Sequence, residues 1–519
     1  MQKELFEWQN ECLDIWFRSG CRGIVNAVTG GGKTVLALNA AKRLESSLRE
    51  QGHKLKIRII VPKTFLVSQW RAAILEETDA RRGDIGCYFG SHKDDPSLRY
   101  MIYVLNSARF SLSRHILADI QKGFHVLLIV DECHHCSGEI NAKIFDFVPR
   151  LAESAFRYHS LGLSATAEKI AQDSRFSTAL GNVIYRYELP RALREGVVSD
   201  FMLFQAGVSF LPEERGEYED LSVSLAKAIT SVRKLCPALR RLGGAAFFAR
   251  LEKLSAEGGK AGAAAAQVML LSYRRKEIMH LAENRIACAC GIVRLLPAHS
   301  KILLFGERIE CAQQIYARLC GMFPGQAAMY HSGMSRESAK NALSRYQDGE
   351  VRILVGCRAL DEGLNVPETD VGIVVSSSRA ALQRVQRLGR ILRRKQSGLP
   401  AKLYYLYLEN TGEEAAYLEN CSGDGFPVIP LIYDGETDRF LCAEFGPLAE
   451  RVLAYGGDKK IAPAEKAELL KNMELCLLRG DFCLAEELCV RERENAEDQP
   501  ERNYWTAALL LARARLDRL

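Results

Sequence analysis

Residues 27–34, AVTGGGKT, constrain the fold of this chain more than any other segment. They follow a short apolar stretch and precede the helix-forming segment 35–44, which gives the order strand, loop and helix. Three consecutive glycines let the backbone wrap around phosphate oxygens, and the following helix terminus adds partial positive charge. We therefore predict a phosphate-binding loop at one end of a strand in an α/β sheet.

Within this loop we expect Lys33 to neutralise the β- and γ-phosphates of ATP and the Thr34 hydroxyl to ligate Mg²⁺. The rest of the nucleotide cradle would come from Thr29, Gly30, Gly31 and Gly32. The alternative is a glycine-rich turn ahead of an ordinary helix. The order strand, loop, Gly-Lys-Thr and helix favours the phosphate-binding loop.

An acidic pair, Asp131 and Glu132, ends the apolar run 126–130. A buried parallel strand would place both carboxylates at the edge of the sheet where α/β ligands bind. We expect Asp131 to hold Mg²⁺, usually through water, and Glu132 to polarise the attacking water. The adjacent residues 133–136, CHHC, cannot all reach one tetrahedral zinc ion, because no loop separates them.

Two stretches of the chain alternate short apolar segments with amphipathic ones, the pattern of parallel sheets covered by helices. Strands are predicted at 23–27, 57–61, 101–105, 126–130 and 160–163, and again at 302–305, 327–330, 353–355, 372–375 and 403–408. This α/β pattern predicts tandem domains at 1–204 and 298–410, separated by a helical insertion at 205–297 with a turn at 257–262. A mostly helical accessory region would follow at 411–519, with a hairpin at 428–445 and a helical hairpin at 469–489.

Charge is distributed unevenly along the chain. Residues 411–519 carry 22 acidic and 13 basic side chains, so the total of +6 leaves about +15 for residues 1–410. A basic body suits a polyanion such as nucleic acid. The first residues show no signal pattern, no apolar run could span a membrane, and the 16 cysteines are scattered. We therefore expect a cytoplasmic location.

Residues 386–393, QRLGRILR, place Arg390 and Arg393 on one face of a predicted helix. Together with Gln386, these arginines could act across a cleft on the γ-phosphate and stabilise the charge of the transition state. The alternative is a solvated basic helix or one that touches nucleic acid. The phosphate loop and the acidic pair favour the first interpretation.

Taken in order, these segments resemble the DExH branch of superfamily 2 helicases, most of all the XPB-like group and the motor subunits of type III restriction enzymes. Trp8-Gln9 is similar to the adenine-reading motif of that family. The remaining motifs are matched by residues 29–34, 61–70, 106–108, 131–134, 162–166, 302–307, 330–333, 361–367 and 386–393. The resemblance covers roughly residues 1–410 and implies two RecA-like domains that close on ATP, with movement 3′ to 5′ along one strand.

The resemblance also implies individual roles. Gln9, Asp361 and Gly363 would contact the nucleotide. One strand of nucleic acid would be contacted by Pro62, Lys63, Gln69 and Ser107, and by Arg358, which stands next to Cys357 where relatives often have Thr or Ser. His134, Ser164 and Thr166 would couple the state of ATP to movement between domains.

The insertion carries a basic segment, residues 273–276, followed by Asn284 and Arg285. In relatives such helices lie over the duplex, and the alternative is a solvated connector. The acidic tail would dock a protein partner or the motor itself, and its Trp505 and residues 507–512 could be core. We predict an ATP-dependent DNA helicase or translocase, in DNA repair, restriction or phage defence. An RNA helicase and an ATP-gated clamp that recruits an effector remain alternatives.

Overall fold

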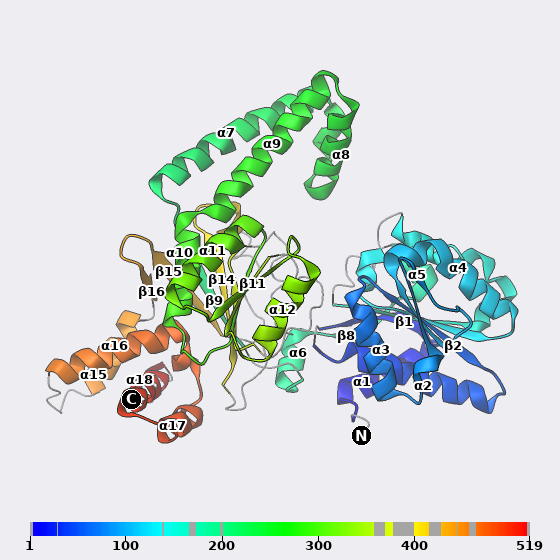
Figure 1. Ribbon diagram of the computed structural model, residues 1–519, viewed down its shortest axis with the longest axis horizontal. Helices are drawn as coiled ribbons and strands as arrows, with labels where there is room; N and C mark the ends of the chain where they lie inside the picture. The colour runs from blue at the N-terminus through cyan, green and yellow to red at the C-terminus, as the bar shows by residue number, and fades with distance from the viewer. Residues whose placement is uncertain are drawn as a thin grey trace. The chain divides into compact units, whose positions relative to one another are not determined.

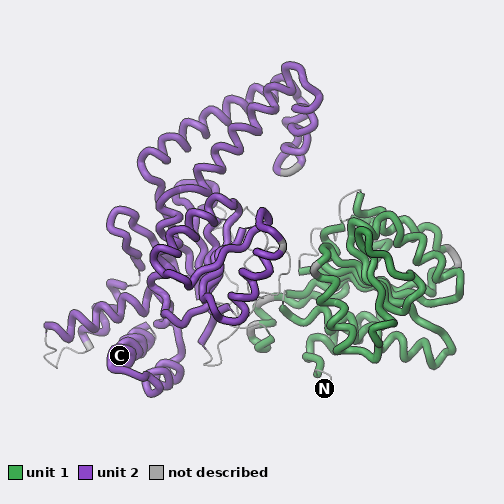
Figure 2. The backbone as a smooth tube through the Cα atoms, in the orientation of Figure 1, with its two compact units in different colours: residues 1–200, 361–365, 382–391 green, residues 201–360, 366–381, 392–519 purple. Residues whose placement is uncertain are grey.

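The computed structural model describes residues 4–28, 30–136, 140–165, 173–197, 201–357, 369–376, 399–414, 427–443, 445–455 and 463–515. These residues form two compact units, one up to residue 197 and the other from residue 201 onward (Figure 2). Each unit is built around an eight-stranded sheet with helices packed against it (Figure 1). None of the described helices is both long enough and apolar enough to cross a membrane.

The first sheet has the strand order β4-β3-β5-β2-β6-β7-β1-β8, and every pairing in it is parallel except β3 with β4. Its strands are β1 Arg22–Ala27, β2 Leu55–Val61, β3 Ile85–Phe89, β4 His92–Lys93, β5 Tyr100–Val104, β6 His125–Val130, β7 Tyr158–Ser164 and β8 Val183–Tyr187. The five strands predicted from apolar runs are confirmed. The other three were not predicted, because β4 is short and exposed and β3 and β8 contain polar residues or glycine.

Helices of the first unit follow the strands closely: α1 Glu7–Arg18, α2 Lys33–Glu50, α3 Phe65–Glu77, α4 Leu105–Gln121, α5 Ser174–Leu180 and α6 Leu189–Arg194. Short 3-10 turns lie at Arg82–Asp84, Cys133–Cys136, Asn141–Phe145, Val148–Arg150 and Ala152–Arg157. Three of these helices begin at or soon after the carboxyl end of a strand, α2 after β1, α3 after β2 and α4 after β5. Loops between these strands and helices therefore meet at one edge of the sheet.

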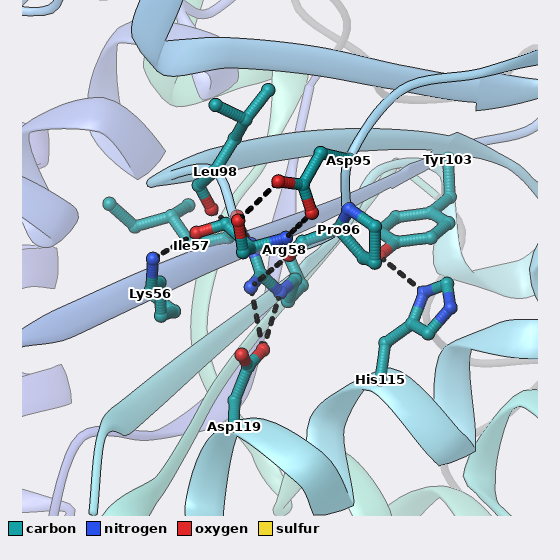
Figure 3. Close-up of polar contacts among 10 residues, drawn as sticks. Lys56, Ile57, Arg58, Asp95, Pro96, Leu98, Tyr103, His115 and Asp119 are labelled. Carbon is teal, nitrogen blue, oxygen red and sulfur yellow. Dashed lines mark hydrogen bonds and ion pairs between the residues drawn. The ribbon is translucent and has the colours of Figure 1, made fainter. Parts of the chain in front are cut away.

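A buried ion pair holds α4 against the middle of this sheet (Figure 3). Arg58 on β2 is fully buried, and its Nη2 lies 2.6 Å from the Asp119 carboxylate on α4. The same guanidinium donates to the carbonyl oxygens of Pro96 and Leu98 at 2.9 and 3.0 Å, so the segment before β5 is fastened as well. Removing one partner of such a pair costs about 3–5 kcal/mol, because a charge is left buried.

The second sheet has the order β11-β12-β10-β13-β14-β9-β15-β16, again parallel except for the last pair. Its strands are β9 Phe201–Val208, β10 Ile302–Gly306, β11 Ala327–His331, β12 Ile353–Cys357, β13 Val371–Val374, β14 Ala401–Leu408, β15 Val428–Asp434 and β16 Arg439–Leu441. The five predicted strands and the predicted hairpin are confirmed. The expected boundary at residue 204 falls inside β9, which belongs to the second sheet and not to the first domain.

The helical insertion is shorter than predicted. Helices α7 Pro212–Leu235, α8 Gly244–Glu257 and α9 Gly259–Leu281 extend away from the second sheet (Figure 1) and share a small core of their own that includes Val232, Leu251 and Val268. We call these three helices the projection. The predicted insertion also included α10 Glu283–Leu295, but that helix is buried in the core of the second sheet.

The C-terminal region is part of the second unit and not a separate module as predicted. Its β15 pairs with β9 along six residues. Besides α11 Ile309–Met322 and α12 Arg336–Gln347, the unit contains α15 Phe445–Tyr455, α16 Pro463–Arg479, α17 Glu486–Glu494 and α18 Gln499–Arg515, with 3-10 turns at Pro237–Arg241 and Asp481–Cys483. Apolar residues of α16 and α18, including Trp505, join the same core as β9 and β14. The overall acidic composition of the tail did not indicate this buried side.

Candidate active site

The phosphate loop connects β1 to α2 as predicted, with glycines where the backbone requires them. Gly30 and Gly32 have φ angles of 83° and 88°, a region that side chains other than glycine rarely adopt. A Cβ atom on Gly32 would also lie 2.7 Å from the Gln9 side-chain nitrogen. Thr29 lies outside the described residues, and Thr34 is half-buried in the first turn of α2. Gly30 and Gly32 therefore adopt the backbone conformation that a tight phosphate-binding loop requires.

Lys33 is the only charged residue of this loop, and it is buried. Its Nζ donates to the carbonyl oxygen of Ala27 at 3.1 Å and lies 3.6 Å from Glu132 Oε1. The side chain is only 6% exposed, so its charge acts in surroundings that water screens weakly. A buried ammonium group beside a glycine loop is suited to an anion with several negative charges.

Gln9 joins α1 to the phosphate loop. Its Nε2 donates to the carbonyl oxygen of Gly32 at 3.0 Å, and its Oε1 accepts from the Phe6 N–H at 2.9 Å. The neighbouring Trp8 is fully buried and stacks on Tyr187, with ring centroids 4.4 Å apart. Tyr187 lies on β8, and its backbone carbonyl accepts a hydrogen bond from the Val28 N–H at 2.8 Å. Sequence analysis did not identify Tyr187, because its strand was not predicted.

The acidic pair lies where β6 ends, beside the phosphate loop. Glu132 has a φ angle of 45°, a conformation that costs energy for a residue with a side chain and that often occurs at functional sites. Asp131 accepts a hydrogen bond through Oδ2 from the indole N–H of Trp70 on α3, at 2.9 Å. Trp70 was quoted only as part of a motif, and no role was assigned to it from the sequence.

The residues predicted to couple ATP to movement come together in part. His134 Nδ1 lies 3.0 Å from the Ser164 hydroxyl at the end of β7, and 3.4 Å from Glu132 Oε2. His134 therefore lies between Glu132 and Ser164. Thr166 lies outside the described residues.

Residues predicted to contact nucleic acid lie at the same edge of the first sheet. Pro62 and Lys63 follow β2, and the Lys63 and Gln69 side chains are exposed. Ser107, in the first turn of α4, accepts a hydrogen bond from the Gly90 N–H at 3.2 Å. Strand ends of β1, β2, β5 and β6 thus carry the phosphate loop, the acidic pair and these residues together.

Several residues predicted to contact the nucleotide or nucleic acid fall in undescribed segments. Gln386, Arg390, Arg393, Arg358, Asp361 and Gly363 lie outside the described residues. Asn284 and Arg285, considered as nucleic-acid contacts, are buried instead. Arg285 is fully buried, pairs with the Glu413 carboxylate and donates to the Val375 carbonyl at 3.2 Å, so it fixes α10 to the sheet. Helical spacing alone could not separate a buried arginine from an exposed one.

The sequence CHHC does not present exposed thiolates. Cys133 and Cys136 are buried in the core of the first unit, and burial raises the pKa of the Cys136 thiol to about 12. A thiol in this environment stays protonated at neutral pH and binds metal weakly. No group of three potential metal ligands of the His, Cys, Asp and Glu types occurs among the described residues.

The site residues fit a magnesium nucleotide chemically. A glycine loop and a buried ammonium group suit the phosphates, while a hydroxyl and a carboxylate, Thr34 and Asp131, are the oxygen ligands that Mg²⁺ takes beside nucleotide phosphates. Glu132 is held next to them through Lys33 and His134. The α/β fold and this site together have the features of a protein that binds a nucleoside triphosphate.

Comparisons with known proteins identify the group. Residues 2–169 match the family described as type III restriction enzyme, res subunit, and residues 285–395 match the helicase conserved C-terminal domain. The chain is 27% identical to the DNA 3′-5′ translocase XPB2 of Sulfurisphaera tokodaii over 76% of this chain and 79% of that protein. It is 25% identical to a candidate DNA 3′-5′ helicase, Rad25, of Halobacterium salinarum over 79% of this chain and 55% of that protein. The chain is a superfamily 2 helicase of the group that includes XPB and the type III restriction motors.

Solved structures agree on the fold. The helicase domain of Pyrococcus furiosus Hef aligns with a TM-score of 0.51 and 19% identity, covering 80% of this chain and 97% of that one. A fragment of a candidate HsdR subunit of a type I restriction enzyme from Vibrio vulnificus aligns with a TM-score of 0.50 and 17% identity, covering 83% and 68%. The prediction of two tandem RecA-like domains is confirmed.

Proposed function

We propose that this protein is a DNA-stimulated ATPase that moves 3′ to 5′ along one strand, with Mg²⁺ as the partner ion of ATP. The contact between Lys33 and Glu132 carries the proposal, because a buried ammonium group that would bind phosphate lies 3.6 Å from the carboxylate that would act as general base. The names of the relatives, a DNA translocase and a DNA helicase, favour DNA over RNA.

This chain's own residues divide the work. Lys33 and the loop amides would bind the phosphates, Gln9 would read the base, and Glu132 would accept a proton from the attacking water. Bound Mg²⁺ would supply electrostatic stabilisation of charge on the phosphate oxygens. His134 and Ser164 would report the state of the site to the strand-contact residues. For Gln386, Arg390 and Arg393 we propose the role that their motif implies, stabilisation of charge on the γ-phosphate.

The direct test compares ATP hydrolysis with no nucleic acid, with single-stranded DNA, with duplex DNA and with RNA. We expect strong stimulation by DNA, and a loss of at least about a hundredfold in Glu132→Gln, because general bases typically contribute 10²–10⁴-fold. Lys33→Ala should lose hydrolysis together with ATP binding. Equal rates with and without every nucleic acid would contradict the proposal, and stimulation by RNA alone would assign an RNA helicase.

The cellular setting is a separate part of the proposal. We propose a cytoplasmic protein of DNA repair, restriction or phage defence, since motors of this class serve all three. The clamp alternative predicts tight DNA binding without stimulated hydrolysis. Strand displacement on tailed duplexes then separates unwinding from translocation along an intact duplex.

A further inference from the structure

Helix α3 has two faces that point to different parts of the site. Its inner face carries the buried side chains Val67, Trp70 and Ile74, spaced three and four residues apart. Its outer face carries the exposed Ser68 and Gln69. Both faces belong to one helix of 13 residues, so a rigid-body shift of this helix would displace both of them.

Trp70 makes the polar contact of the inner face. Its side chain is 2% exposed, and its indole N–H donates to Asp131 Oδ2 at 2.9 Å. The neighbouring strands explain this contact, because β2 leads into α3, β6 leads into Asp131, and the Asp131 N–H donates to the Ile60 carbonyl at 2.9 Å. An indole N–H can only donate, so it is matched to an ionised carboxylate and fixes which oxygen faces α3.

We propose that Trp70 is a positioning residue that orients Asp131 and links it mechanically to the strand-contact face of α3. Nucleic acid bound at Lys63 and Gln69 thereby acts on the carboxylate that faces the nucleotide, through one side chain. This inference rests on the proposed function. It adds a second connection to the one through His134 and Ser164, on the opposite side of the acidic pair.

The test uses Trp70→Phe in the full chain, with Trp16→Phe as the matched control. Trp16 is also fully buried in the first unit, and its indole N–H also donates a hydrogen bond, to the Ser160 carbonyl at 2.9 Å. Both variants lose an indole and one buried hydrogen bond, but only one of them touches Asp131. Binding of a non-hydrolysable ATP analogue is measured with Mg²⁺ and with EDTA, each with and without single-stranded DNA.

In Trp70→Phe we expect the Mg²⁺-dependent gain in analogue affinity to fall about tenfold, the size typical of losing a partner of a metal-holding side chain. Affinity in EDTA and affinity for DNA without nucleotide should stay within about twofold of wild type, because the loop and the outer face are intact. DNA should no longer enhance analogue binding. The proposal is overturned if Trp70→Phe and Trp16→Phe change analogue affinity alike, or if Trp70→Phe loses as much affinity in EDTA as with Mg²⁺. Either result would mean that Trp70 only packs in the core.

A measurement on the unaltered chain covers the case in which Trp70→Phe does not fold. The chain has four tryptophans, so 5-fluorotryptophan gives four ¹⁹F signals, which Trp8→Phe, Trp16→Phe and Trp505→Phe assign by elimination. The Trp70 signal should shift when single-stranded DNA is added without nucleotide. It should shift again when the non-hydrolysable ATP analogue is added with Mg²⁺. An unmoved signal in both cases overturns the link. If wild type shows no stimulation by any nucleic acid, the proposed function fails instead, independently of Trp70.

Discussion

The second unit contains two helical regions of opposite character, the projection α7–α9 and the C-terminal helices α15–α18. Both have helical sequence patterns outside the predicted strands of the motor. The projection packs on itself around Leu251 and Val268, whereas the C-terminal helices place Leu477 and Trp505 in the core of the second sheet. Helical composition therefore does not indicate whether a region is needed for the sheet to fold. That is decided by what the apolar face of each region covers.

The ends of each region reinforce this difference. The projection begins and ends at nearly the same point, since the Glu283 N–H donates to Glu214 Oε1 at 2.8 Å. The C-terminal region instead starts within the sheet, where β15 extends it beyond β9. The projection can therefore be removed at its base. Removal of the C-terminal region would instead expose the edge and one face of the second sheet.

The largest effect should come from deleting the two regions in turn. A chain that ends at residue 410 loses β15, β16 and the helices that cover β9 and β14, so we expect the second unit not to fold cooperatively. Replacing residues 215–279 by a short glycine-serine linker should leave that unit folded and the ATP hydrolysis of the whole chain measurable. Urea unfolding followed by circular dichroism checks both. A folded second unit in the truncated chain would break the comparison.

A single substitution in each region should give a smaller version of the same contrast. Asp481 is buried, lies 2.7 Å from Lys402 on β14 and accepts a hydrogen bond from Tyr504. Asp481→Ala removes the buried carboxylate that Lys402 and Tyr504 contact, which should destabilise the second unit by about 3–5 kcal/mol, because a buried ion pair loses one partner. Leu251→Ala should cost about 2–5 kcal/mol within the projection alone.

Hydrogen exchange distinguishes these two outcomes by location. Asp481→Ala should increase exchange in β9, β14 and β15, whereas Leu251→Ala should increase it only in α7, α8 and α9. Exchange that spreads into the sheet in Leu251→Ala would show that the projection supports the sheet after all.

The smallest effect concerns the junction of the projection with the sheet. His280 lies in the last turn of α9, is buried, and is 3.9 Å from Glu307. Burial lowers the pKa of His280 to about 4. The unfolded chain takes up this proton near pH 6.5, so the folded state loses stability as pH falls from about 6.5 to 4. His280→Gln should remove up to about 3 kcal/mol of that loss. Urea unfolding at pH 7.5, 6 and 5 measures the free energy of unfolding of wild type and of His280→Gln. Parallel pH profiles of this free energy in the two proteins would contradict the prediction.

Sequence patterns were sufficient where the residues that make up a feature are also neighbours in the chain. The phosphate loop, the acidic pair and ten strands were predicted because each is a continuous segment whose apolar or glycine-rich character has a local cause. Strand β9 was missed because it stands alone before the projection, more than 190 residues from its partner β14. The pairing of two strands so far apart in the chain cannot be recognised from a local sequence pattern.

By itself, the sequence determined the helicase class and the nucleotide chemistry, because residues such as Lys33 and Glu132 must occur in short motifs with fixed spacing. Only the tertiary structure decided that Arg285 is buried, that the acidic tail completes the second sheet, and that Trp70 reaches Asp131. Each of these depends on which surfaces meet after the chain has folded. Burial and hydrogen bonding between distant segments are properties of that packing, so no single segment encodes them.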